Sequence, residues 1–463
     1  MNCKFSTIRQ LIGLFTTAIL FCSCANMIPP SGGDKDTLAP VLISAFPKDS
    51  CLNFTGKKIT LTFDEYVEAK DIQQNLVVNP LPKNQPVVDY KLQQVFVTLK
   101  DTLEPNTTYT INFGNAIKDV NEGNPAKNKT YTFSTGKYID SNTISGKVIM
   151  ANTGKVDSTL IAVLYTNLND SAVLKLKPRY LEKLDGKGFF KFTNLPTAKF
   201  NLYILPNEYS KKYDDSSKPF AFLNNAIYTK DSVSNYTLFA YKEVEVEEKK
   251  PATKQDDDKN KTPEKLKFTT SLVNNRFDVL DTALLLYFNK KIKLNNISNI
   301  QLTDTNYAAV KDYNIAIDTN KTSIIIKNNF VLGSRYCLVI NKDAVIDTFN
   351  NPLSKTDTIK FATLEEKDYG NIKIRCSKKT DNVVLQFISN GKLFASLPFT
   401  QKEIYKKLFN PGEYELRVLL DENNNGLWDA GNYKLKKQPE RVIALTTKLL
   451  VKANWDNEIE INW

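Results

Sequence analysis

Four short blocks of sequence occur twice in this chain, in the same order, and this repetition constrains the fold more than any other feature. The first copies lie within residues 37–136 and the second copies within residues 266–364. The matched pairs are residues 59–65 with 284–290, 108–111 with 335–338, 117–125 with 345–352, and 131–135 with 359–363. Ordered matches of this kind indicate two copies of one domain.

Each block has the pattern of a half-buried β-strand. Apolar and polar residues alternate, as in Ile59-Thr60-Leu61-Thr62-Phe63, and turn-forming runs such as Glu104-Pro105-Asn106 separate the blocks. The chain contains 26 Phe and 21 Tyr, which favour strands, and it lacks a long stretch of helical periodicity. Several short strands within about 100 residues are typical of a β-sandwich. We therefore predict an all-β protein.

The repeated domain resembles the bacterial Ig-like domain of surface-layer and Bacteroidetes envelope proteins. Residues 37–136 carry the Leu-x-Pro-x-Thr-x-Tyr block, which begins at Leu103, and the closing Phe-x-Thr block, which begins at Phe133. Residues 266–364 keep the closing block but have Val331-Leu332-Gly333-Ser334 where the Leu-x-Pro block belongs. The resemblance implies an Ig-like sandwich for both segments, and it is weaker for the second.

The segments that follow the two copies also form a pair. Residues 142–241 contain Ile144-Ser145-Gly146-Lys147-Val148 and a run from Asp185 to Pro196 with alternating phenylalanines. This segment resembles the carboxypeptidase-regulatory (transthyretin-like) β-sandwich. Residues 368–463 keep only the later half of the pattern. We predict four tandem Ig-like or transthyretin-like β-sandwich domains in an A-B-A′-B′ order.

A charged stretch separates the two A-B pairs. Residues 242–265 contain 15 charged residues among 24, two prolines and no aromatic residue. Such a composition does not bury enough apolar surface to order itself. We predict a linker that joins two A-B rods.

The N-terminal residues resemble a bacterial lipoprotein signal. A short basic region precedes an apolar run that is too short to span a bilayer, and Ser23 lies directly before Cys24. The resemblance implies that residues 1–23 are a signal peptide and that Cys24 carries the lipid; Cys22 fits less well because it follows the bulky Phe21. Residues 24–36 then form a flexible spacer. An ordinary secretory signal and a buried N-terminal helix remain the alternatives.

The resemblance also suggests a location. The residue after Cys24 is Ala25 rather than the Asp that retains enterobacterial lipoproteins at the inner membrane. We predict an outer-membrane lipoprotein of the cell envelope, bound to the membrane through Cys24. The sequence does not indicate which face of the membrane it occupies.

The composition excludes several kinds of chemistry. The chain has no histidine, so nucleophile–His pairs and His-ligated metals are absent. Asp64 and Glu65 follow each other in an expected strand, where they would point to opposite faces and not act together. The net charge of +11 comes from lysines scattered among acids and not from one basic stripe, which argues against nucleic-acid binding. We predict a protein that is not an enzyme.

One loop has the spacing of a metal site. Asp421, Asn423, Asn425 and Asp429 occupy positions 1, 3, 5 and 9 of a run with glycine at position 6, as in a calcium loop of the EF-hand kind. Position 12 is Asn432, where calcium loops have a bidentate Glu, so any calcium binding is expected to be weak. A tight Asn/Gly hairpin connection is the other interpretation, and no other cofactor is predicted.

The three tryptophans all lie in the last predicted domain, and they leave the function open. Trp428 lies in a loop, where it could form part of a glycan site, whereas Trp463 continues an alternating strand and fits a core. We predict a structural, adhesive or scaffolding protein. The alternatives are a carbohydrate-binding accessory lipoprotein and a subunit of an envelope transport or motility complex. The sequence identifies neither a protein nor a polysaccharide partner.

Overall fold

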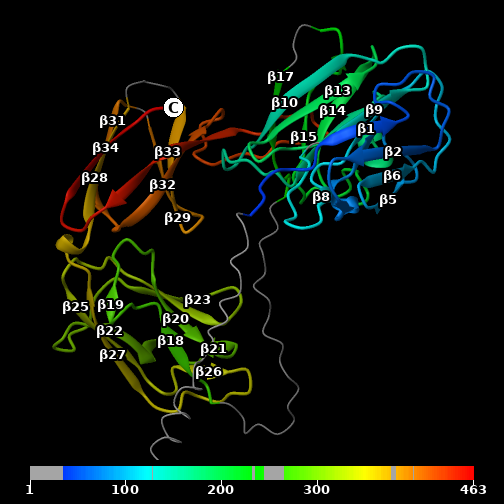
Figure 1. Cartoon of the computed structure of the whole chain (residues 1–463). Coiled ribbons are helices and arrows are strands. Elements are labelled where there is room, and N and C mark those ends of the chain that lie inside the picture. Colours follow the sequence, from blue (N-terminus) through cyan, green and yellow to red (C-terminus); the bar gives the residue numbers. More distant parts are fainter. Residues whose placement is uncertain (1–34, 128, 232–234, 245–264, 377–381, 400) are drawn as a thin grey trace, which may run out of the picture. The chain divides into compact units, whose positions relative to one another are not determined.

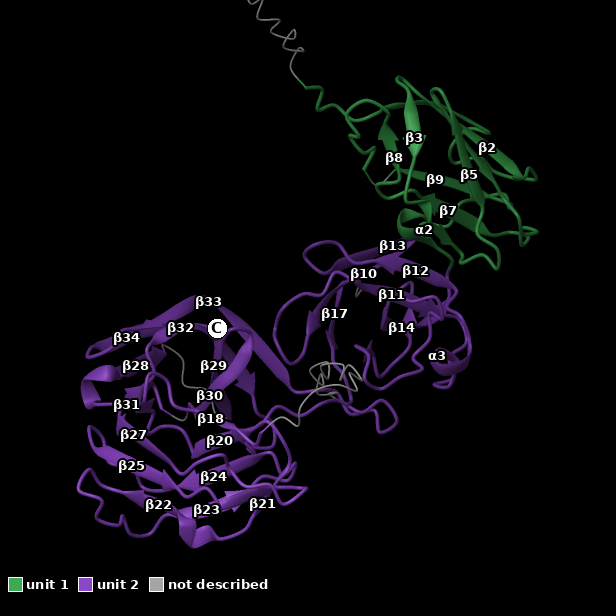
Figure 2. Ribbon diagram, turned by 90° about the horizontal axis from the view of Figure 1, so that it is seen from below, with its two compact units in different colours: residues 1–141, 194–196 green, residues 142–193, 197–463 purple. Residues whose placement is uncertain are grey.

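The computed structural model describes residues 35–463 except 128, 232–234, 245–264, 377–381 and 400. The predicted signal peptide, Cys24, most of the spacer and most of the charged linker therefore lie outside the described residues. The described chain is nearly all β (Figure 1). It divides into two compact units, one of residues 1–141 with 194–196 and one of residues 142–193 with 197–463 (Figure 2). Within the described residues, no helix combines the length and apolar character needed to cross a bilayer.

The first unit is a sandwich of antiparallel sheets. One sheet has the order β1 (Leu42–Phe46), β2 (Lys58–Phe63), β6 (Gln94–Thr98), β5 (Val87–Lys91), and the other has the order β4 (Val77–Asn79), β7 (Thr108–Asn112), β9 (Thr130–Ser134). A short pair, β3 (Val67–Ala69) with β8 (Ile117–Asp119), and the helical turn α2 (Ile72–Asn75) complete it. The alternating apolar residues of β2, β6, β7 and β9 form the buried core, as the sequence pattern predicts.

The second Ig-like copy repeats this arrangement within the larger unit. Its sheets have the orders β18 (Phe268–Thr270), β20 (Leu284–Phe288), β24 (Ser323–Lys327), β23 (Asn314–Ile317), and β19 (Arg276–Phe277), β27 (Asp357–Thr363), β25 (Arg335–Ile340), β22 (Ile300–Thr303). The short pair β21 (Ile292–Leu294) with β26 (Val345–Asp347) corresponds to β3 with β8, and a 3-10 turn, η1 (Ile297–Asn299), precedes β22.

The two copies also share a tyrosine at the same corner of the fold. The hydroxyl of Tyr109 accepts a hydrogen bond from the backbone N–H of Glu104 at 2.8 Å, and the ring stacks on Phe133 with centroids 5.1 Å apart. In the second copy, the Tyr336 hydroxyl accepts from Val331 N–H at 3.1 Å, and its ring stacks on Phe361 at 5.6 Å. The repeated sequence blocks therefore encode a repeated structure, although the second copy lacks the Leu-x-Pro block.

The other two sandwiches form a second matched pair. Residues 142–241 build the sheets β13 (Phe189–Leu195), β10 (Asn142–Met150), β17 (Asn235–Ala240), and β12 (Tyr180–Lys183), β11 (Leu160–Tyr165), β14 (Lys199–Pro206), β15 (Ala221–Phe222), with β16 (Ile227–Tyr228) on β14 and the turn α3 (Ala172–Lys175) nearby. The last segment builds β31 (Glu403–Phe409), β28 (Gly370–Cys376), β34 (Asp456–Ile461), and β30 (Lys392–Pro398), β29 (Val383–Ser389), β32 (Gly412–Leu420), β33 (Arg441–Val451), after the turn η2 (Glu366–Asp368).

The two sandwiches share a pairing of their first and last strands that is not evident from their sequences. In both, the first strand pairs in parallel with the last strand: β10 with β17, and β28 with β34. In both, the larger of the two sheets is antiparallel. The sequence indicated only the later half of this pattern in residues 368–463, because the early strands of that segment carry no distinctive turn motif.

Asp64 and Glu65 do not lie in a strand, since β2 ends at Phe63, and the Asp64 carboxylate accepts a hydrogen bond from Val41 N–H at 2.8 Å. Cys337 is buried within β25. Within the described part of the chain, Cys51, Cys337 and Cys376 are not joined by disulfide bonds.

A candidate functional site between two sandwiches

The connection between β32 and β33 is closed at its base by two buried carboxylates. The Asp421 carboxylate accepts hydrogen bonds from Asn425 N–H at 3.2 Å and Gly426 N–H at 2.8 Å. The Glu440 carboxylate accepts from Glu422 N–H at 2.9 Å and from Asp429 N–H at 3.0 Å. Each carboxylate accepts from two backbone donors of the connection, so this long connection has a defined shape.

The structure brings the four predicted metal ligands together in this loop. The side-chain amides of Asn423 and Asn425 donate to the same carboxylate oxygen of Asp429. Their side-chain oxygens accept from Asn425 N–H at 3.1 Å and from Leu427 N–H at 2.7 Å. These are the bonds of an Asn-rich turn. No group of three or more His, Cys, Asp or Glu is placed to hold a metal in the described part of the chain, and calcium binding by this loop stays a prediction.

Trp428 supports the loop from within. Its ring packs against Val384, Leu419 and Val442, and its indole N–H donates to the Glu440 carbonyl at 2.8 Å. Trp428 is half-buried and is not an exposed platform for a sugar. Trp463 packs edge-on against Phe399, which agrees with the core role that its strand pattern predicts.

Beyond this base, residues 429–440, which we call the docking loop, contact the second sandwich (residues 142–244). The ring of Tyr433 lies among the aromatic side chains of that sandwich and is 4% exposed. The distances between its centroid and theirs are 5.0 Å to Phe220, 5.1 Å to Phe222, 5.9 Å to Tyr203 and 6.2 Å to Tyr213, each nearly perpendicular. Edge-to-face pairs of this kind contribute about 0.5–1.5 kcal/mol each beyond area burial.

The polar atoms of Tyr433 are also bonded to the second sandwich. Its hydroxyl donates to the Asp170 carbonyl at 2.9 Å and lies 3.0 Å from the hydroxyl of Tyr203. Because Tyr433 has one hydroxyl proton, Tyr203 is the donor of this second bond. The backbone N–H of Tyr433 donates to the Glu243 carboxylate at 2.9 Å. Burial, followed by the bond to Tyr203, raises the pKa of Tyr433, so its hydroxyl stays neutral.

Other residues of the docking loop complete the contact. The Lys436 ammonium lies 2.5 Å from the Asp170 carboxylate and 4.3 Å from the centroid of the Tyr433 ring. The Gln438 side chain donates to the Phe222 carbonyl at 3.2 Å and to the Asn224 side chain at 3.1 Å.

Gly431 allows the close approach of the two chains at this point. A Cβ atom at this position would lie 2.6 Å from the ring of Tyr241. Only glycine fits here without a shift of the ring or of the loop.

The second sandwich inserts a turn of its own into the last sandwich. Residues 151–155, which we call the docking turn, follow β10. Val442 N–H of β33 donates to the Ala151 carbonyl at 2.8 Å, and Lys155 pairs with Glu415 of β32 at 2.7 Å. Gly154 has a φ of +66°, and a Cβ atom there would lie 2.5 Å from the backbone nitrogen of Ala444. The contact between the two sandwiches is therefore reciprocal.

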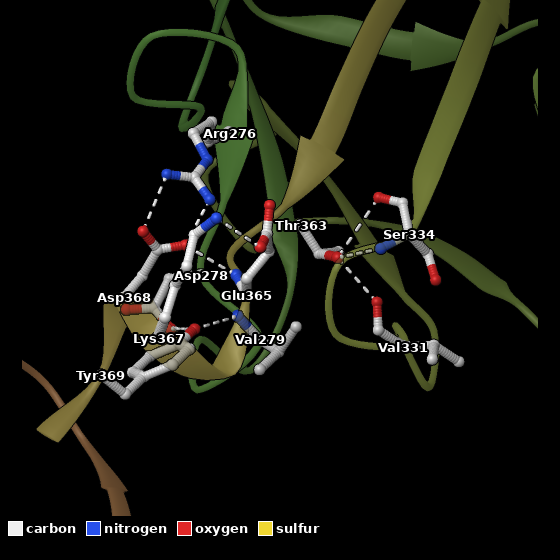
Figure 3. A network of polar contacts seen from close by, with 10 residues as sticks. All are labelled: Arg276, Asp278, Val279, Val331, Ser334, Thr363, Glu365, Lys367, Asp368 and Tyr369. Carbon is white, nitrogen blue, oxygen red and sulfur yellow. Dashed lines mark hydrogen bonds and ion pairs between the residues drawn. The ribbon is translucent and has the colours of Figure 1, made fainter. Parts of the chain in front are cut away.

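A smaller polar network joins the third and last sandwiches (Figure 3). The Asp278 carboxylate accepts from the Tyr369 hydroxyl at 2.6 Å. It also accepts from the Asn410 side chain at 2.8 Å. Arg276 binds the Asp368 carboxylate through two guanidinium nitrogens, one of them at 3.2 Å. A bidentate pair fixes orientation as well as distance.

Sequence reasoning did not identify the docking residues. Tyr433, Gly431 and Gly154 belong to connections without periodicity, so no pattern relates them to the pocket at Tyr203. One feature of the sequence does point to them. The connection formed by residues 421–440 is longer than the ~12–15 residues of ordinary connections, and long connections commonly have a function.

Comparison with known proteins identifies the first sandwich. Residues 36–135 match the family described as bacterial Ig-like domain, which agrees with the strand order of the first sandwich. No curated protein matches the chain.

Solved structures with similar strands have very low sequence identity. The TIE protein of Bacillus anthracis is 11% identical, with 94% of this chain and 76% of that chain covered and a TM-score of 0.17. The S-layer protein SbsC is 13% identical over 91% of this chain and 54% of its own, with a TM-score of 0.17. BcpA, the major pilin subunit of Bacillus cereus, is 9% identical over 70% and 99%, with a TM-score of 0.18. The fold is therefore assigned from the strand pairing of this chain itself.

Proposed function

We propose that this protein is a non-enzymatic scaffold of the bacterial cell envelope, anchored through a lipid on Cys24. The observation that carries the scaffold role is the insertion of Tyr433 into the aromatic pocket of another sandwich. Tyr433 and Lys436 bind the second sandwich through hydrogen bonds and an ion pair, so that two domains of the second unit are held to one another. A chain that fixes its own domains in this way is suited to hold partners at set positions.

The anchor is the second part of the proposal. An acyl chain contributes about 0.8 kcal/mol per buried CH₂, so several chains on one cysteine hold a protein stably on a bilayer. Residues 25–34 would then connect the anchor to the first Ig-like domain. We place the protein at the outer membrane, because Ala25 follows the cysteine.

A labelling experiment tests the anchor. Cells that express the full chain are grown with a labelled fatty acid, and the chain is compared with its Cys24→Ala and Cys22→Ala variants. We expect label in the parent and in the Cys22 variant, and none in the Cys24 variant. An inhibitor of signal peptidase II should cause the uncleaved parent to accumulate. Equal label in the Cys24 variant would contradict the assignment.

One observation favours a second candidate, a subunit of an envelope complex. In the first unit, Leu38, Val41, Ile43 and Phe46 have exposed fractions of 74%, 60%, 65% and 78%. They lie on or just before β1, whose pairing among the described residues is with β2 on one side. An exposed apolar group at a sheet edge is a common site of protein association.

In-cell photocrosslinking separates this candidate from a free-standing scaffold. A photoreactive residue at position 46 is compared with one at position 209, where Tyr209 is 91% exposed on another sandwich. A partner protein at the β1 edge would give a discrete adduct from position 46 alone. Equal or absent adducts from both positions would argue against the complex. The half-buried state of Trp428 does not favour the glycan-binding alternative.

A further inference from the structure

We propose that the second sandwich recognises the docking loop as a separate binding partner, so that residues 265–463 remain bound to residues 35–244 after the linker between them is cut. The partner of this surface is thus the C-terminal half of the same chain. This inference goes beyond the proposed scaffold role and does not depend on the lipid anchor.

The docking loop is shaped by its own domain before it meets the pocket. Asn432 and Lys437 exchange two backbone hydrogen bonds, at 2.8 and 3.0 Å, and so place Tyr433 within a small hairpin. Leu435 N–H donates to the Asn432 side chain at 2.9 Å. The base of the loop is held by Glu440 and Trp428. Binding therefore orders little new structure, which reduces its entropy cost.

The pocket is likewise built by the second sandwich alone. Phe220 and Tyr241 exchange backbone hydrogen bonds at 2.8 and 2.9 Å. The ring of Tyr213 stacks on Phe220 with centroids 4.0 Å apart, and Tyr213 N–H donates to the Val173 carbonyl at 3.0 Å. The Tyr165 hydroxyl lies 3.1 Å from the carbonyl oxygens of both Leu176 and Lys211, between which its one proton is shared. None of these bonds requires the C-terminal half.

The chemistry of the contact is that of a binding hot spot. Tyr433 is a buried aromatic anchor with its hydroxyl and its backbone N–H both bonded, and Lys436 adds an ion pair with Asp170 at the margin. Residues of this type carry most of the free energy in protein interfaces. The docking turn adds a second contact point through Val442 and Gly154, so the two sandwiches do not pivot about a single residue.

On this proposal, the predicted linker raises the effective concentration of the two halves and is not needed for the contact itself. A linker that spans the two sites holds the partners at an effective concentration of the order of millimolar. A contact with a dissociation constant in the micromolar range would be closed nearly all the time in the intact chain. A contact with a dissociation constant well below micromolar would also persist between separate halves at micromolar concentration.

The test cuts the linker in the folded protein. A recognition sequence for a site-specific protease replaces residues 252–258 of the full chain, and the purified protein is cleaved and passed over a sizing column with light scattering. We expect one peak with the mass of both halves at micromolar concentration. Two peaks with the masses of the separate halves would overturn the proposal.

Matched variants locate the contact. Gly431→Val places a side chain against the Tyr241 ring, and Tyr433→Ala removes the anchor. Gly186→Val is the control, because a Cβ there has no neighbour within 4 Å and Gly186 lies in the same sandwich as the pocket. After cleavage, both interface variants should weaken association by at least about tenfold, and the control should not.

The fold of each variant is checked separately. Circular dichroism and denaturant unfolding of the cleaved variants show whether each half keeps its sheets. Folded halves that stay together in both the Gly431 and Tyr433 variants would refute the assignment of the contact. Unfolding confined to the Gly431 variant would leave Tyr433→Ala to decide the question.

Discussion

The hydroxyl oxygens of Tyr203 and Tyr433 lie 3.0 Å apart, although 230 positions separate the two residues in the chain. The contact joins the centre of the second sandwich to the long connection of the last one. Because Tyr433 also donates to the Asp170 carbonyl, a single side chain ties two strand systems together. Several consequences of this arrangement can be measured.

The hydroxyl of Tyr433 should contribute to stability apart from its ring. Tyr433→Phe leaves the aromatic contacts but deprives Tyr203 of its acceptor and the Asp170 carbonyl of its donor. We expect a loss of about 1–3 kcal/mol in the free energy of unfolding, measured with urea. Tyr433→Ala should cost about 3–5 kcal/mol, since it also leaves a cavity. Tyr209→Phe, at an exposed tyrosine, should change little and serves as the control.

Substitution by alanine should destabilise the protein more at Gly154 than at Gly391, a glycine with a similar backbone conformation but with open space around it. Gly154 and Gly391 have φ values of +66° and +76°, but a Cβ at Gly391 would have no neighbour within 4 Å. Gly391→Ala should cost only the backbone strain, about 1 kcal/mol. Gly154→Ala should cost clearly more, because its Cβ meets the backbone of β33. Equal melting midpoints for the two variants would contradict the close packing of the docking turn.

Asp347 should make the third sandwich sensitive to acid. Burial alone would raise the pKa of Asp347, but hydrogen bonds from the Asn351 side chain and backbone, from Phe349 N–H and from Lys290 outweigh it and lower the pKa to about 2. An unfolded Asp has a pKa of about 3.9. Because the pKa of Asp347 is lower in the folded than in the unfolded protein, its carboxylate stabilises the fold fully above about pH 4. This stabilisation is lost as the pH falls toward 2.

The measurement for Asp347 is a comparison with Asp347→Asn. Urea midpoints of the parent and the variant are determined at pH 7, 4, 3 and 2. The parent should be the more stable at pH 7, and its advantage should shrink between pH 4 and pH 2. A constant difference across this range would show that the Asp347 carboxylate does not carry the effect.

Calcium binding by the loop of Asp421, Asn423, Asn425 and Asp429 can be separated from the loop's structural role. Asp421→Ala should lower the melting midpoint even in EDTA, because Gly426 N–H loses its acceptor and Asn425 N–H loses one of its two acceptors. If the loop also binds calcium, millimolar calcium should raise the midpoint of the parent, and Asp429→Ala should abolish that rise. No rise in the parent would leave the Asn/Gly hairpin interpretation.

The Asp278–Tyr369 contact tests how firmly the third and last sandwiches are joined. Tyr369→Phe removes the donor to Asp278 and the acceptor of Val279 N–H, and it should destabilise the protein by about 1–3 kcal/mol. Tyr405→Phe is a suitable control, because Tyr405 is exposed on β31. Hydrogen exchange of the Val279 amide should accelerate in Tyr369→Phe and remain unchanged in the control.

The sequence by itself determined the strands and the repeat. Alternation of side chains, as in Ile59 to Phe63, is a local property, and the pairs Tyr109 with Phe133 and Tyr336 with Phe361 recur because the same blocks fold in the same way. Only the tertiary structure decided that Tyr433 enters the pocket beside Tyr203, and that Gly431 lies against Tyr241. Those contacts join irregular connections from distant parts of the chain, and hydrogen bonding and packing between such segments leave no period in the sequence. The Asp421 loop shows the same limit, since carboxylates and amides spaced for a metal are also the residues that close a turn.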